Sequence, residues 1–132
     1  MRAGQYDQYG GSEVLRVREV PVPSMRAGHV PVKVDYSSVN AAYVAVRSGS
    51  LSIVNGRKFP RGVGFDFAGE VVGVADDVDV FLADDGMWGF LNGLRRGPLA
   101  AAAEYALGRS VVGEGAIAVR QVHDFLATAG RH

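Results

Sequence analysis

The chain has 132 residues, 14 acidic and 14 basic side chains, and no cysteine. This length predicts a single domain, and the zero net charge argues against a broad nucleic-acid-binding face. The lack of cysteine excludes disulfides, cysteine-ligated zinc and a cysteine nucleophile, and no apolar run reaches the roughly 18 residues of a membrane span. Without a hydrophobic signal core at the N-terminus, we expect a soluble cytoplasmic protein with no membrane partner.

The first half of the chain favours strands joined by tight turns. Residues 2–6 and 14–19 predict a hairpin around the turn at 9–12, and the prolines that follow predict a connection over 21–28. Alternating apolar residues at 30–36 predict a half-buried strand. Residues 40–47 predict one or two helical turns that stop at the serines and glycine of 48–50, and 51–61 predicts an irregular surface loop.

The second half continues the strand pattern and then changes. Residues 64–74 carry the clearest strand signal, with glycines that suggest bends, and shorter strands are expected at 87–91 and 103–107. The acidic stretch 76–85 predicts a solvated loop, because it lacks the spacing of a calcium loop. Apolar spacing over 116–129 predicts an amphipathic helix that ends at Gly130. We therefore expect a mainly β domain at 1–109 and a strand–helix appendage at 110–132.

Several short motifs occur in an order that resembles one known family. They are YGGSEVL (9–15), VPVP (20–23), SVN (38–40), RSG (47–49), FP (59–60), GFDFAGEV (64–71), MWGF (87–90) and AEY (103–105). In this order they resemble the N-terminal catalytic domain of the medium-chain dehydrogenase/reductase superfamily, in its zinc-free quinone-oxidoreductase branch. The resemblance implies a GroES-like, partly open β-barrel with short helices.

The resemblance also implies a second, NADPH-binding Rossmann domain, which this chain is too short to contain in complete form. A dinucleotide site needs at least a βαβ unit of about 30 residues. Gly113, Gly115 and Ala118 match a G-x-G-x-x-A fingerprint, but the acidic ribose-binding residue expected about 20 residues later falls beyond His132. We interpret the match as a glycine turn before a helix. No cofactor is expected, and NADPH only where a second nucleotide-binding chain supplies the site.

Asn40, Tyr43 and Asp66 are the candidate catalytic residues. The resemblance implies that Asn40 lies near the nicotinamide and the substrate, and the alternative is a helix N-cap or Asx turn. Tyr43 lies three residues further on, so one helical turn would face both side chains to one pocket, where its hydroxyl can donate a hydrogen bond. An apolar setting would raise the pKa of Asp66 for proton transfer, and the alternative is a structural acceptor or a partner for Arg47 or Arg61.

Arg47, Phe65, Trp88 and Phe90 are the candidate substrate-binding residues. Trp88 and Phe90 would line a cavity, although a lone tryptophan is more often a core residue. The histidines are too scattered for a metal site, so no metal is expected.

These observations favour a stand-alone domain that binds a small apolar organic molecule and catalyses cofactor-free cyclisation or isomerisation. The first alternative is an NADPH-dependent quinone oxidoreductase-like remnant or subunit. The second is a non-catalytic binding module that forms a homodimer through its free β edges.

Overall fold

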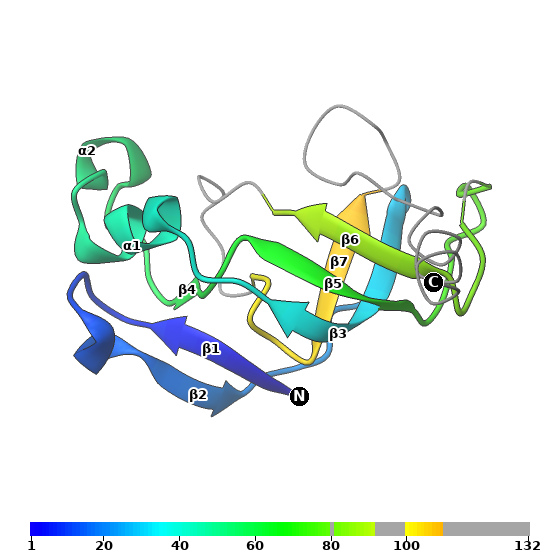
Figure 1. Ribbon diagram of the computed structural model, residues 1–132, viewed down its shortest axis with the longest axis horizontal. Coiled ribbons are helices and arrows are strands. Elements are labelled where there is room, and N and C mark those ends of the chain that lie inside the picture. The colour runs from blue at the N-terminus through cyan, green and yellow to red at the C-terminus, as the bar shows by residue number, and fades with distance from the viewer. Residues whose placement is uncertain (80, 92–99, 110–132) are drawn as a thin grey trace, which may run out of the picture.

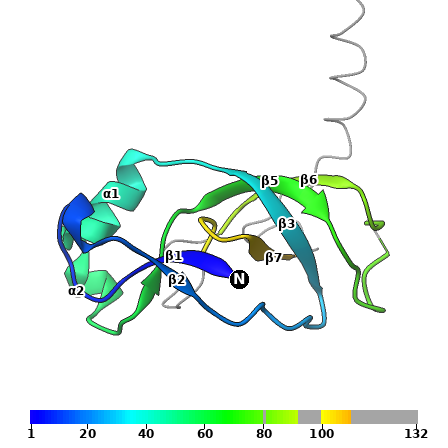
Figure 2. The ribbon, with the colours of Figure 1, turned by 90° about the horizontal axis from the view of Figure 1, so that it is seen from below.

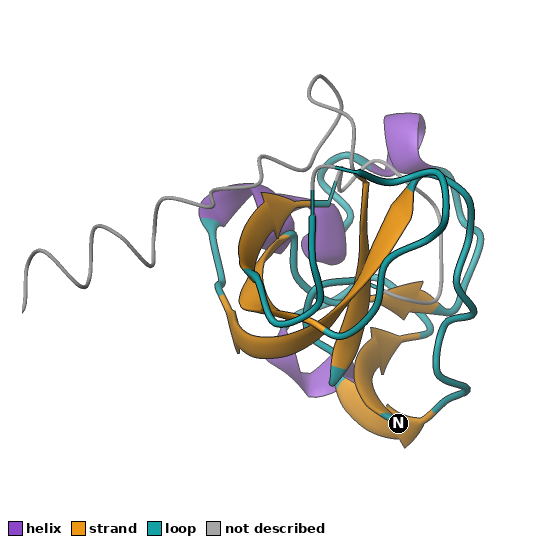
Figure 3. Ribbon diagram, turned by 90° about the vertical axis from the view of Figure 1, so that its right-hand side faces the viewer, coloured by secondary structure: helices purple, strands orange, loops and turns teal. Residues whose placement is uncertain are grey.

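The computed structural model describes residues 1–79, 81–91 and 100–109 (Figure 1). The expected appendage at 110–132, with its helix and its glycine fingerprint, lies outside the described residues. Strands dominate the described chain and the helices are short, which confirms the mainly β class (Figure 3).

The N-terminal hairpin belongs to a small antiparallel sheet. Strand β1 (Arg2–Tyr6) pairs on one side with β2 (Arg16–Glu19) and on the other with β4 (Arg61–Gly62). A short 3-10 helix, η1 (Ser12–Val14), lies in the turn of the hairpin. The pairing of Tyr6 with Arg61 ties the end of the hairpin to a distant part of the sequence.

The larger sheet is antiparallel throughout, with the strand order β6-β5-β3-β7. Its strands are β3 (His29–Ser37), β5 (Asp66–Val71), β6 (Gly86–Phe90) and β7 (Tyr105–Arg109). The register of β3 against β5 shifts between Val34 and Tyr36, and an isolated bridge from Ala3 to Ala103 links β1 to the segment just before β7. Both sheets stay open within the described residues, consistent with a GroES-like domain rather than a closed barrel.

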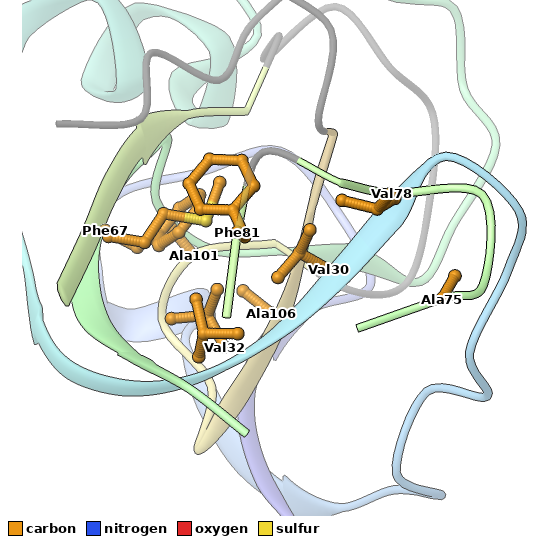
Figure 4. Packing of buried hydrophobic residues seen from close by; sticks show 10 residues of the cluster. Val30, Val32, Phe67, Ala75, Val78, Phe81, Ala101 and Ala106 are labelled. Atoms are coloured by element: carbon orange, nitrogen blue, oxygen red, sulfur yellow. The ribbon is translucent and has the colours of Figure 1, made fainter. Parts of the chain in front are cut away.

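The main core lies on one face of the larger sheet, where alternate strand residues point inward (Figure 4). Val30, Val32 and Val71 are fully buried, and Phe67 and Met87 pack with them. Val78 and Phe81 come from the loop between β5 and β6 and cover this cluster. The acidic loop at 76–85 is therefore solvated only in part, since its apolar side chains contribute to the core.

Helix α1 (Ala41–Ser48) follows β3 as the sequence predicts. Asn40 caps its N-terminus, and Gly49 ends it in the left-handed conformation at φ 89°. Gly49 is suited to this position because it lacks a Cβ atom.

The expectation of an irregular surface loop at 51–61 is wrong. The segment forms helix α2 (Ser52–Asn55) and strand β4, and it buries Asn55 and Arg61. The Arg61 guanidinium donates to the carbonyl oxygens of Asn55 and Gly56, and its Nε donates to that of Lys58. A single buried side chain thus organises the turn, and local composition gives no sign of it.

Candidate functional site

Asn40 and Asp66 meet at the junction of helix α1 and strand β5. The Asn40 amide nitrogen donates to Asp66 Oδ2 over 2.8 Å, and the Ser38 hydroxyl donates to the same oxygen over 2.6 Å. The Asn40 Oδ1 accepts from the backbone N–H of Tyr43 over 2.9 Å. Asn40 therefore acts as the helix cap and also positions the carboxylate of Asp66.

Asp66 is half-buried and is held by neutral donors. Within the described residues, no hydrogen bond is donated to Asp66 Oδ1, and neither Arg47 nor Arg61 bonds to the Asp66 carboxylate. Asp66 lies opposite Phe90 in the β5–β6 ladder. One carboxylate oxygen is thus fixed, and the other remains able to accept a hydrogen bond beside an aromatic side chain.

Tyr43 and Phe65 form a second, smaller buried cluster with Val46. Their rings meet edge to face with centroids 5.8 Å apart, and Phe65 meets Phe90 in the same way at 5.7 Å. The Tyr43 hydroxyl is buried and bonds to neither Asn40 nor Asp66. Burial raises the pKa of Tyr43, against an opposing effect of nearby Arg47, so the hydroxyl is a donor at neutral pH.

The two aromatic residues of β6 lie on the outer face of the sheet. Trp88 is 39% exposed and lies opposite Ala68, and Phe90 is 44% exposed. A lone tryptophan is usually a core residue, but Trp88 lies on the outer face of the sheet. Alternation explains this, because the inward positions of β6 are taken by Met87 and Gly89.

Arg47 lies apart from the Asp66 carboxylate, with its guanidinium 5.7 Å from the centre of the Tyr43 ring. The structure therefore brings Asn40, Asp66, Phe65 and Phe90 together, with Trp88 on the same strand face as Phe90. Tyr43 contacts Phe65 through its ring, whereas its hydroxyl lies on the side of Tyr6 and Arg47. We call the group Asn40, Asp66, Phe65, Trp88 and Phe90 the Asp66 site.

Sequence reasoning missed Ser38, whose position two residues before Asn40 was the available signal. It also missed the burial of Asn55 and Arg61, for which the sequence offers no local signal.

Neither helix of the described residues has the long, uncapped N-terminus that typically holds a cofactor phosphate. The exposed N–H groups of a helix N-terminus can hold a phosphate, but Asn40 already caps α1, and α2 has only four residues. Within the same ranges, no three His, Asp or Glu side chains gather closely enough to hold a metal ion. The described helices include none that is long and apolar enough to span a membrane.

Residues 26–119 match the family described as the alcohol dehydrogenase GroES-like domain. The chain is 39% identical over 101 residues to the chloroplastic quinone-oxidoreductase QR1 of Triphysaria versicolor, which covers 76% of this chain and 31% of that protein. It is 37% identical over 101 residues to a chloroplast envelope quinone oxidoreductase homolog of Arabidopsis thaliana, with the same shares. The chain thus spans about a third of the length of these relatives.

Solved structures agree with the sequence comparisons. The quinone oxidoreductase of Coxiella burnetii superposes with a TM-score of 0.73 and 29% identity, over 83% of this chain and 34% of that one. A mycobacterial protein solved in complex with NADPH gives a TM-score of 0.67 and 25% identity, over 83% of this chain and 30% of that one. The shared region is the β domain described above.

Proposed function

Because the chain belongs to the alcohol dehydrogenase GroES-like domain family, we propose that it is the substrate-binding domain of a quinone oxidoreductase-like protein. Its ligand is a small, flat, conjugated carbonyl compound of the quinone type, bound at the Asp66 site. NADPH would be held by a second nucleotide-binding chain or domain, because neither described helix has an N-terminus suited to its phosphates.

The observation that supports this proposal is the position of Asp66 beside exposed aromatic rings. Phe90 and Trp88 present about two-fifths of their surface to solvent on one strand face, and Phe65 supports Phe90 from the interior. A flat apolar ring gains by covering such a face, and aromatic contacts add about 0.5–1.5 kcal/mol per pair. The same face is too exposed to be explained as core packing.

The hydrogen bonds of Asp66 suit it to recognise the reduced, hydroxyl-bearing form of such a ligand. Ser38 and Asn40 hold Oδ2, so that Oδ1 is positioned to accept a hydrogen bond from a phenolic or enolic O–H. Asn40 is anchored in turn by the helix that it caps. The role of Asn40 in this proposal is therefore to position Asp66, and its amide need not contact the ligand.

Cofactor-free isomerisation or cyclisation remains a second candidate, and the unpartnered Oδ1 of Asp66 favours it. A carboxylate with one anchored oxygen can accept a proton from a carbon next to a carbonyl group and return it elsewhere in the molecule. Both candidates need Asp66 as an acceptor, but only the oxidoreductase needs a nicotinamide.

Fluorescence of Trp88, the single tryptophan of the chain, provides a direct test of ligand binding. We expect 1,4-naphthoquinone to quench it with a saturable component that Phe90→Ala weakens at least several-fold. Asp66→Asn should weaken only the binding of the reduced form, 1,4-dihydroxynaphthalene, which has the O–H groups that Asp66 accepts. Val17→Ala, on the exposed edge strand of the other sheet, is the matched control and should leave the curve unchanged. Purely linear, collisional quenching in the unaltered protein would rule out the proposed site.

Two further expectations stay predictions. A homodimer would use the edge strands of the open sheets, such as β2 or β6. A cytoplasmic location is also untested, since the plant relatives bear chloroplast locations in their names.

A further inference from the structure

Helices α1 and α2, strand β4 and the end of β1 come together at one end of the molecule (Figures 1 and 2), and these elements carry a group of polar side chains. It consists of Tyr6, Tyr43, Arg47, Asn55 and Arg61, and we call it the arginine–tyrosine cluster. Tyr6, Tyr43, Asn55 and Arg61 are each at most 5% exposed, and Arg47 is half-buried. The cluster uses none of the polar atoms of Asn40 or Asp66.

Arg61 brings a buried positive charge that no carboxylate neutralises within the described residues. Its hydrogen bonds go to backbone carbonyl oxygens and to the side chain of Tyr6, and its guanidinium lies 5.5 Å from the ring centre of Tyr9 and 5.3 Å from that of Phe59. The ion pairs among the described residues do not include it. A buried cation without a counter-charge is costly, so an anion at this position would be strongly favoured.

Arg47 adds a second cation from helix α1. Its Nε is buried without a hydrogen-bond partner, and its guanidinium faces the Tyr43 ring. The carboxylate within its electrostatic reach is that of Glu13, which is exposed and accepts a hydrogen bond from the Gly11 N–H. Glu13 therefore leaves the buried Nε without an acceptor.

Every buried side-chain polar atom that lacks a partner in the described ranges belongs to this cluster. These atoms are the Tyr43 hydroxyl, Arg47 Nε, and both the nitrogen and the oxygen of the Asn55 amide. Buried polar groups are almost always hydrogen-bonded, and leaving one unpaired costs about 1–3 kcal/mol. These unpaired atoms all occur on side chains of the cluster, which favours a bound group that supplies the missing partners.

Tyr6 connects the two halves of the cluster. It pairs with Arg61 across β1 and β4, and both Arg61 and Arg47 act on its hydroxyl electrostatically. Tyr6 and Tyr43 also lie within electrostatic reach of each other. Both arginines thus act on the same tyrosine, and this shared neighbour is the basis for placing one small ion between their charges.

We propose that the arginine–tyrosine cluster binds a small carboxylate-type oxyanion such as formate, acetate or hydrogencarbonate. Arg47 Nε, the Tyr43 hydroxyl and the Asn55 amide nitrogen are the available donors, and the ion supplies the counter-charge for both arginines. Small size follows from the close packing of the cluster against Phe59 and Phe65. The cluster shares no side chain with the Asp66 site, although Tyr43 packs against Phe65 of that site, and the proposal does not depend on the proposed function.

The test is thermal unfolding of the full chain in formate against chloride at constant ionic strength and pH 7. We expect a saturable rise in Tm on the order of 4 °C in formate. Arg47→Gln should abolish the rise. Arg57→Gln, an exposed arginine close to α2, is the matched control and should retain it.

If Arg47→Gln fails to fold, a second variant still tests whether the cluster binds an anion. Asn55→Asp places a carboxylate inside the cluster, so we expect it to raise Tm in chloride and to remove the response to formate. A formate response that persists in Asn55→Asp or Arg47→Gln would overturn the proposal. Equal melting of the unaltered protein in formate and chloride would overturn it as well, and would assign the unpaired atoms to ordered water.

Discussion

At the scale of the residue, Asn40 shows how one side chain can serve both the fold and the site. Its oxygen caps α1 and its nitrogen holds Asp66. The sequence offered capping and function as alternatives, whereas the geometry combines capping with the positioning of Asp66. The reason is chemical, because an amide has a donor and an acceptor that point in different directions.

The buried hydroxyl of Tyr43 leads to a prediction about pH. Burial raises the pKa of Tyr43 above its ordinary value of about 10. The folded state therefore holds this proton more tightly than the unfolded state, so the stability it contributes is complete below about pH 10 and is lost as the pH rises further.

We accordingly expect the free energy of unfolding to fall more steeply above pH 10 in the unaltered protein than in Tyr43→Phe. At pH 7 in chloride, Tyr43→Phe should raise the free energy of unfolding by about 1–3 kcal/mol, because it removes a buried hydroxyl that has no partner. Urea denaturation across pH 7–11 measures both effects. Tyr36→Phe, at a 76% exposed position, is the control, and an equal change in both variants would contradict the explanation.

At the scale of the element, the ladder between β3 and β5 depends on Gly69. The sequence marks this glycine as a bend, and the structure adds the physical reason. A Cβ atom at Gly69 would overlap the backbone carbonyl of Lys33 on the neighbouring strand. The strands approach closely here, at the position where Gly69 pairs with Val34 just before the register shift.

Gly69→Ala should therefore destabilise the protein by about 3 kcal/mol, because the backbone of β3 must move. Gly86→Ala is the matched control on β6, where an added Cβ meets nothing within 4 Å, and it should cost less than about 1 kcal/mol. Chemical denaturation of the two variants side by side gives the comparison. Similar losses for both would show that the close approach is not the cause.

At the scale of the whole molecule, the chain corresponds to about a third of its relatives. Its described part has the GroES-like fold and an acceptor beside aromatic rings, and neither of its helices has an N-terminus suited to a dinucleotide phosphate. We expect NADPH up to millimolar concentration to leave Tm unchanged, whereas a ligand at 100 times its Kd would stabilise the fold by about 2.7 kcal/mol. A saturable increase in Tm, together with a change in nicotinamide fluorescence, would contradict this expectation.

The sequence by itself determined the strands other than β4, the first helix and the family resemblance, because alternation, capping residues and turn glycines act over a few neighbouring positions. It also placed Asn40, Asp66, Phe65 and Phe90 among the site candidates, through motifs that each span only a few residues. What those side chains contact was decided by the tertiary structure, as was the outward position of Trp88.

Only the tertiary structure decided that 51–61 folds inward and that Arg47 and Arg61 both lie close to Tyr6. The physical reason is that such contacts join residues far apart in the sequence. The buried guanidinium of Arg61 organises its loop through carbonyl oxygens that any residues could supply. Local composition has no signature for that arrangement, so the arginine–tyrosine cluster emerges only once the strands and helices are packed together.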